Sequence, residues 1–386
     1  MEKRMKKSFA AATVAAVLTL TLGNTAAQAA DPVSITGAGS TFVANYLEAC
    51  KPGFSAATGN IVNYTATGSG TGRTNFMNGT VDFAISDSLF KATDKVSDYT
   101  YVPLIAGPVA IMYNLPSVKD PIQLSTKTLA NIFAGNIKNW NDRQIAADNV
   151  VKAQPAIYKN LKKLDKKTKK YVTVKTLIQP AIPAHTLKIP STPITVAYRS
   201  DSSGTSQIVS DYLHAVQPSI FTKSGSGTFS AALPNGVPAD GTFQAASGSD
   251  GVSNLVAQKV GAIAYSEMSF AKERKLGVAT LQNAAGKWIA PTAAGASAFL
   301  SNFGTQGNGV ITPNYTNTDP AAYNLSAFTY GVAHTKGMNA AKADAVRSLF
   351  TYLADTCAPL QAEAKFYAPL PAPVLTISKI HIAEIG

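Results

Sequence analysis

Residues 199–205 read Arg199-Ser200-Asp201-Ser202-Ser203-Gly204-Thr205, immediately before an apolar-periodic segment at 208–213. Hydroxyl and carboxylate side chains in this place are typical of a helix N-terminus. The first turn of a helix leaves backbone N–H groups without partners, and the helix dipole makes that end partly positive. Gly204 lets an anion approach the backbone, and the guanidinium of Arg199 matches the oxygens of phosphate or carboxylate. The stretch therefore predicts an anion pocket, although an N-capped helix with a surface Arg199–Asp201 ion pair also fits it.

Two other turns rich in Gly, Ser and Thr precede helix-like segments. Residues 36–42 read Thr36-Gly37-Ala38-Gly39-Ser40-Thr41-Phe42, and residues 68–72 read Gly68-Ser69-Gly70-Thr71-Gly72. Residues 81–87 read as a short strand that delivers Asp87 to a loop. Turns of this composition, each opening a helix, are a recurring way of holding an oxyanion with backbone amides.

Strand-like and helix-like segments alternate along the chain. Short strands are expected at 33–36, 61–64, 81–85 and 109–114, and helical runs at 47–54, 73–78 and 128–133. This alternation predicts an α/β fold with a largely parallel sheet. Ligands on such sheets bind beyond the carboxyl ends of the strands, which is where the Gly-rich turns lie.

The three turns and the Asp87 loop resemble those of the phosphate-binding proteins of high-affinity phosphate ABC transporters. Landmarks at 132–140, 261–265 and 367–371 agree, and the resemblance runs from Ile35 to about Ile377. It implies a two-lobed periplasmic-binding-protein fold of type II, with two crossovers and the ligand in the interlobe cleft.

The resemblance also implies that one lobe is discontinuous along the chain. With crossovers near Pro103–Pro108 and near Leu281, lobe one is expected to comprise residues 30–105 plus 281–386 and lobe two residues 106–280. A departure from the family pattern lies at about 150–190, where the chain is longer than expected and rich in lysine.

Motif by motif, the resemblance assigns the phosphate-binding residues as follows: Thr41, Phe42, Ser69, Asp87, Arg199, Ser203, Gly204 and Thr205. The hydroxyls would donate to the ligand, while Phe42 and Gly204 would act through their backbone N–H groups. Asp201 matches the carboxylate that stands beside the arginine in the family.

Asp87 is unexpected in an anion site because a carboxylate repels an anion. It becomes favourable only when the ligand carries a proton to donate, since an ionised Asp only accepts hydrogen bonds. Phosphate has such a proton at neutral pH and sulfate has none, so Asp87 is expected to select phosphate. The alternative is that Asp87 caps a helix.

The function implied by the resemblance is a receptor that binds inorganic phosphate and delivers it to a membrane ABC permease, without cofactor, metal or enzymatic activity. We expect a monomer that does not bind nucleic acid. Two alternatives remain open: a polyanion- or matrix-binding protein that uses the lysine-rich segment, and a secreted phosphatase or serine hydrolase. The phosphatase or hydrolase alternative lacks a catalytic base, because no His stands in a local motif with any serine of these turns.

Residues 1–29 are expected to be a cleaved secretory signal peptide. Four basic residues precede an apolar run, 9–22, and Ala27-Gln28-Ala29 follows as the cleavage site. No Cys follows that site, so a lipid anchor is not expected, and the predicted location is periplasmic or secreted.

The net charge of +12 is concentrated in one segment. Residues 152–175 hold nine Lys and one Asp, or +8, and residues 1–29 contribute +3, which leaves about +1 for the rest of the chain. The segment is expected to be a solvated insertion. The alternative is a contact surface for anionic lipid, polysaccharide or polyphosphate.

Two cysteines, Cys50 and Cys357, make a disulfide the favoured state in an exported protein, with two separate buried thiols as the alternative. The four His are scattered and no metal-binding spacing is present. Two positions depart from the family pattern. Ser202 replaces a common Gly and would be strained at a positive φ, and Arg73 is expected to face outward, or else to add a second cation near the pocket.

Overall fold

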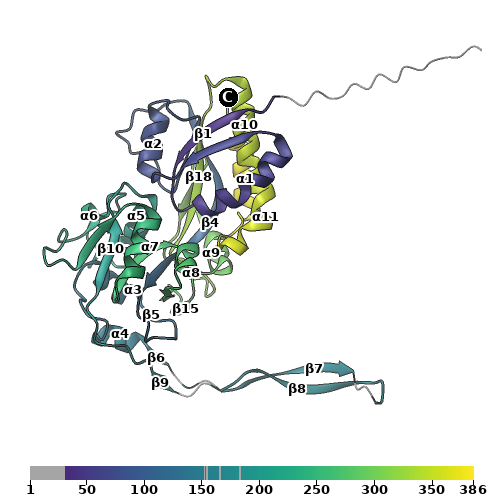
Figure 1. Ribbon diagram of the computed structural model, residues 1–386. Helices are drawn as coiled ribbons and strands as arrows, with labels where there is room; N and C mark the ends of the chain where they lie inside the picture. Colours follow the sequence, from purple (N-terminus) through teal and green to yellow (C-terminus); the bar gives the residue numbers. More distant parts are fainter. Residues whose placement is uncertain (1–30, 152, 154, 165–166, 182–183) are drawn as a thin grey trace, which may run out of the picture. The chain divides into compact units, whose positions relative to one another are not determined.

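The computed structural model describes residues 31–386, apart from residues 152, 154, 165–166 and 182–183 (Figure 1). The expected signal peptide therefore lies outside the described residues. No helix of the described chain has both the length and the apolar character needed to cross a membrane.

A mixed sheet of nine strands organises the described chain from Val33 onward (Figure 1). Its strand order is β11-β10-β12-β4-β18-β3-β1-β2, and β13 also pairs with β4. The bounds are β1 (Ser34–Gly39), β2 (Ile61–Thr65), β3 (Phe83–Ser86), β4 (Tyr99–Tyr113), β10 (Thr195–Arg199), β11 (Phe243–Ala246), β12 (Ala262–Glu267), β13 (Gly277–Val278) and β18 (Ser326–His334). The α/β class is as expected.

The sheet is parallel only in its two outer parts. β1 pairs in parallel with β2 and β3, and β10 with β11 and β12, whereas β4 and β18 pair antiparallel with each other and with their outer neighbours. The expectation of a largely parallel sheet is therefore wrong for the middle of the sheet. The alternation of segments predicts only the end of β4, as a strand at 109–114, and it does not show the antiparallel pairing of β4 with β18, because the two strands lie far apart in the sequence.

Strand β4 belongs to both parts of the sheet. Tyr99–Pro108 pairs with β18, and Val109–Tyr113 pairs with β12. Its 15 residues are buried almost from end to end, as expected for a strand covered on both faces. The change of partner falls at Pro108, at the end of the first expected crossover, and Leu281 lies in β14. The lobe boundaries stay predictions.

Helices flank this sheet. Within the described chain they are α1 (Ala44–Thr58), α2 (Ser69–Met77), α3 (Thr126–Phe133), α4 (Arg143–Asp148), α5 (Gly204–Val216), α6 (Phe229–Ala232), α7 (Gly248–Gln258), α8 (Met268–Glu273), α9 (Ala293–Leu300), α10 (Ala340–Thr351), α11 (Ala358–Gln361) and α12 (Ala372–Ala383). A π-helical turn, Tyr352–Cys357, joins α10 to α11, and a 3-10 turn, Glu363–Lys365, follows. Helix α2 packs on β1 and β3, and α7 packs on β10 and β12.

Four smaller sheets complete the described fold. Their strands are β5 (Gln123–Leu124), β14 (Thr280–Gln282) and β15 (Trp288–Ile289); β16 (Phe303–Gly307) and β17 (Val310–Pro313); β6 (Val150–Val151) and β9 (His185–Thr186); β7 (Ile157–Leu164) and β8 (Tyr171–Gln179). Most of the described residues of the lysine-rich segment thus lie in an antiparallel hairpin, in which β7 and β8 pair with each other alone (Figure 1).

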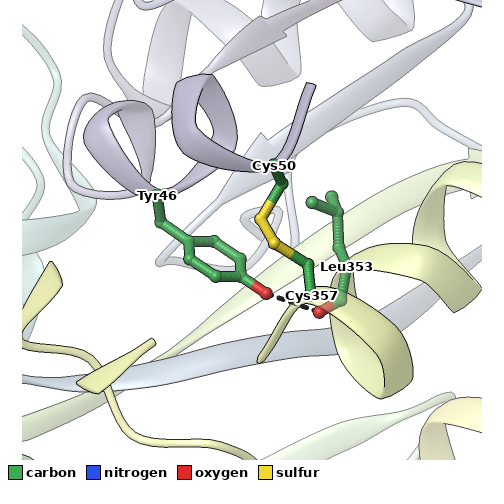
Figure 2. Close-up of a disulfide and its surroundings, with 4 residues drawn as sticks. All are labelled: Tyr46, Cys50, Leu353 and Cys357. Carbon is green, nitrogen blue, oxygen red and sulfur yellow. Dashed lines mark hydrogen bonds between the residues drawn. A yellow bond between two sulfur atoms is a disulfide. The ribbon is translucent and has the colours of Figure 1, made fainter. Parts of the chain in front are cut away.

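The disulfide between Cys50 and Cys357 is confirmed. It joins α1 to the end of the π-helical turn, with the two Cα atoms 5.9 Å apart (Figure 2). One turn earlier on α1, the hydroxyl of Tyr46 donates to the carbonyl of Leu353. Both cysteines are buried within the main apolar core, so the bridge fixes two elements that already pack together.

Candidate functional site

The three Gly-rich turns and the Asp87 loop all follow the carboxyl ends of strands of the main sheet. Strand β1 ends at Gly39, β3 at Ser86 and β10 at Arg199, and α2 begins at Ser69, shortly after β2. They lie close together. A methyl group built on Gly204 would stand 2.6 Å from Oγ of Ser69 and 2.7 Å from Cβ of Asp87. Only a glycine permits this approach of α5 to the loops beside it.

Asp87 is buried and accepts three side-chain hydrogen bonds. Ser40 donates to its Oδ2 at 2.6 Å and Ser69 at 3.3 Å, while Thr329 donates to its Oδ1 at 2.7 Å. Burial raises the pKa of Asp87, and the hydroxyl donors and the charge of Arg199 act in the opposite direction. No helix begins at this loop in the described chain, so Asp87 does not cap a helix.

Arg199 forms a buried, two-point ion pair with Asp201. Its Nε donates to Oδ1 at 2.7 Å and its Nη2 donates to Oδ2, while only 2% of the arginine side chain is exposed. Burial favours a higher pKa of Asp201, but the hydrogen bond and charge of Arg199, together with backbone hydrogen bonds such as that from Gly248, outweigh it and the pKa is lowered. Among the described residues, no acceptor takes the N–H bonds of Nη1. The alternative of a surface ion pair is therefore wrong.

The first turn of α5 supplies further donors. The hydroxyl of Ser203 caps the helix by accepting from the backbone N–H of Ser206 at 3.1 Å. The hydroxyl of Thr205 is buried and has no partner within the described part of the chain. A buried hydroxyl without a partner costs stability, and an anion at this helix end would satisfy it.

The first turn, 40–42, makes hydrogen bonds to protein partners. The hydroxyl of Thr41 lies 2.8 Å from that of Ser249 and accepts from the Ser249 N–H at 3.3 Å. The backbone N–H of Phe42 donates to the hydroxyl of Ser40 at 3.1 Å. These contacts join the start of α1 to the start of α7.

A family model described as a PBP superfamily domain matches residues 25–356. The chain belongs to the PBP superfamily. Among its relatives, the phosphate-binding protein PstS of Xylella fastidiosa is 29% identical over 342 residues, which cover 88% of this chain and 82% of the relative. The phosphate-binding protein PstS 2 of Mycobacterium tuberculosis is 29% identical over 352 residues, 86% of this chain and 79% of the relative.

A solved structure of a high-affinity periplasmic phosphate-binding protein has the same fold as this PBP superfamily member. The TM-score is 0.64 at 22% identity, with 92% of this chain and 99% of that chain covered. The expected two-lobed periplasmic-binding-protein fold of type II is confirmed by this likeness.

Several residues of this PBP superfamily site were missed in the sequence. Thr329 on β18 holds one oxygen of Asp87, and it carries no local signal because it sits within an ordinary apolar strand. Glu267 is the last residue of β12. Burial raises the pKa of its carboxyl group well above the usual range. Its Oε1 has no hydrogen-bond partner among the described residues. Ser249 could have been found, since Gly248-Ser249 opens a helix after a strand, as the other turns do.

Arg73 and Ser202, at the edge of the site, both differ from what the sequence predicted. Arg73 does not face outward: it is buried, and its Nη1 donates to Oγ of Ser86 at 3.1 Å and to the carbonyl of Ser88 at 3.2 Å. It therefore braces the loop that carries Asp87. Ser202 is not among the described residues with positive φ, so no strain arises there. Its carbonyl accepts from the Gly70 N–H at 2.9 Å and joins two of the turns.

Proposed function

We propose that this protein is a receptor that binds inorganic phosphate and delivers it to a membrane ABC permease. The supporting observation is one buried site that combines unpartnered donors with a carboxylate. Arg199 retains the N–H bonds of Nη1, and Thr205 retains a buried hydroxyl, without partners in the described chain. Asp87 lies against the same turn of α5. The relatives that match most of the chain are named phosphate-binding proteins and not enzymes.

The ligand would be held by the residues expected from the sequence: Thr41, Phe42, Ser69, Asp87, Arg199, Ser203, Gly204 and Thr205. Asp87 would accept the proton of the phosphate. Ser40, Ser69 and Thr329 donate to three of the roughly four lone-pair positions of its carboxylate. The Ser69 hydroxyl would leave its position on turning to the ligand, so about one or two positions are open to the phosphate proton. A fully ionised tetrahedral anion such as sulfate would face these positions with an oxygen and be repelled.

The proposal extends to location and mode of action. We infer that the protein works in the periplasm or outside the cell after cleavage of residues 1–29, as a monomer that does not bind nucleic acid. The Cys50–Cys357 disulfide fits an oxidising compartment. Lobes 30–105 plus 281–386 and 106–280 would close on the phosphate by a hinge motion.

Calorimetric titration of ligand-stripped protein tests this function. We expect tight binding of phosphate and of arsenate, which also carries a proton at neutral pH, and no measurable binding of sulfate at the same concentration. Tight sulfate binding, or the absence of phosphate binding, would contradict the proposal.

Asp87→Asn should narrow the preference for phosphate over sulfate. The amide can donate as well as accept and carries no charge, so it no longer repels an unprotonated oxygen. The measurement is the ratio of the two dissociation constants. Asp82→Asn is the matched control, because Asp82 is a partly exposed carboxylate at the other end of the same short strand. An unchanged ratio in Asp87→Asn would remove Asp87 from the specificity mechanism.

Gly204→Ala should weaken phosphate binding because the new methyl group would meet Ser69 and Asp87 at less than 3 Å. Overpacking of this kind costs about 1–3 kcal/mol of stability, and if the whole cost falls on the bound state the affinity drops by roughly 5- to 150-fold. Gly251→Ala is the control, since a methyl group there meets atoms only at ordinary contact distances of 3.4 Å and beyond. Equal affinities for the two variants would mean that α5 does not close on the ligand.

A further inference from the structure

The β7–β8 hairpin has no layer of protein packed against it among the described residues. Its strands pair only with each other, and none of its described side chains belongs to the apolar clusters of the core. A two-stranded hairpin alone is marginally stable in water. We therefore expect the hairpin to be more stable when another surface packs against it.

Large apolar side chains are exposed on this hairpin. Seven of the fourteen exposed large apolar residues of the described chain lie on it: Ile157, Tyr158, Tyr171, Val172, Val174, Leu177 and Ile178. The exposed fraction reaches 73% at Tyr171. Apolar residues gathered in this way mark an interaction surface.

The strand register sorts the side chains into two faces, because directly opposed residues point to the same side of a sheet. The cross-strand pairs Lys159–Thr176, Leu161–Val174 and Lys163–Val172 form one face, which we call the Leu161 face. The pairs Tyr158–Leu177, Asn160–Lys175 and Lys162–Thr173 form the other, the Tyr158 face, on which Tyr171 also lies.

The two faces differ in how their apolar groups are arranged. On the Leu161 face, Leu161, Val172 and Val174 are neighbours, with Lys159 and Lys163 at either end. On the Tyr158 face, the polar pairs Asn160–Lys175 and Lys162–Thr173 separate Tyr158 and Leu177 from Tyr171, so the apolar groups are not continuous. The ammonium of Lys175 lies over the Tyr158 ring, 4.5 Å from its centre.

The lysines that flank the Leu161 face have no acidic partners. Neither Lys159 nor Lys163 forms an ion pair with a carboxylate of the described chain. An uncompensated positive charge beside a strip of aliphatic side chains is the composition of a membrane-interface element, in which lysine stems lie along apolar surface and their ammonium groups reach the headgroups.

We propose that the Leu161 face of the β7–β8 hairpin docks on a bilayer that contains anionic lipid. Lys159 and Lys163 would contact headgroup phosphates, and Leu161, Val172 and Val174 would enter the boundary of the acyl region. A nucleic acid would be held by phosphate contacts and by bases stacked on aromatic rings. Aliphatic side chains offer no such stacking, and they gain only where an apolar phase covers them. The proposal does not depend on phosphate binding.

Sedimentation with lipid vesicles tests the proposal on the purified protein. We expect binding to vesicles of phosphatidylglycerol and phosphatidylcholine in equal parts, weakening as salt is added, and no binding to pure phosphatidylcholine. Leu161→Ser combined with Val174→Ser should reduce vesicle binding by about tenfold or more. Tyr158→Ser combined with Leu177→Ser, a directly opposed pair on the other face, is the matched control and should change it by less than about threefold.

Lys159→Gln combined with Lys163→Gln provides a second variant that leaves the aliphatic strip intact, and it should also weaken binding to the anionic vesicles. Circular dichroism checks that every variant keeps its fold. The proposal is overturned if the protein ignores anionic vesicles, or if both serine pairs act equally. It is also overturned if polyphosphate or single-stranded DNA binds as tightly as the vesicles and the Leu161/Val174 variant binds these polymers unchanged, which would assign the hairpin to polyanions.

Discussion

Replacing Arg199 with alanine is expected to weaken phosphate binding by far more than tenfold. Arg199 is the buried cation whose Nη1 has no acceptor in the described chain, and Asp201 would be left without its partner. Truncating one member of a buried, hydrogen-bonded charge pair costs about 2–5 kcal/mol. Titration calorimetry on ligand-stripped protein measures the loss.

Arg347→Ala is the matched control for this substitution. Arg347 pairs with Asp344 one turn away on α10 and is one-third exposed, so its removal should leave phosphate affinity unchanged. Arg199→Lys keeps the charge but loses the two-point fork, and it should fall between alanine and the native protein. A loss below about tenfold, or ~1.4 kcal/mol, in Arg199→Ala would show that Arg199 does not touch the ligand.

Removing the disulfide through Cys50→Ala and Cys357→Ala should lower the free energy of unfolding by about 2–5 kcal/mol. The bridge closes a loop of 307 residues, so it restricts the unfolded chain strongly. Urea denaturation of the native and double-alanine proteins measures the difference.

Reduced native protein provides the internal control, because with dithiothreitol its denaturation midpoint should move to that of the double-alanine protein. Mass spectrometry of the non-reduced protein after thiol alkylation gives an independent check. Two alkylated cysteines would show that the bridge is absent from the purified protein.

The candidate site could be predicted where its signals are local. Each Gly-rich turn, including Gly204 and Ser69, stands between a strand and a helix within a few residues, and Arg199 precedes its own helix. Thr329 could not be found in this way, because it reaches Asp87 from a strand more than 200 residues later. The prediction that Arg73 faces outward was wrong for a related reason. The sequence of α2 does not show which side of the helix meets the loop after β3.

The fold, too, could be predicted where its signals are local and not where distant segments pair. Alternating segments predicted the α/β class, the strands β1, β2 and β3, and the end of β4, but not β10, β11 or β12. The antiparallel partnership of β4 and β18 depends on pairing between distant segments. The lysine-rich segment also carries a strand signal, because Tyr171–Gln179 is rich in β-branched residues, which favour strands. The segment was expected to be a solvated insertion, and its hairpin was not predicted.

Strand β4 links the unfolding of the two parts of the sheet. Tyr99–Pro108 and Val109–Tyr113 are one continuous strand with partners in both parts of the sheet, so neither part can lose β4 without disturbing a strand that the other part also uses. Their denaturation is therefore coupled, and the two parts should melt in one cooperative transition and not as independent foldons.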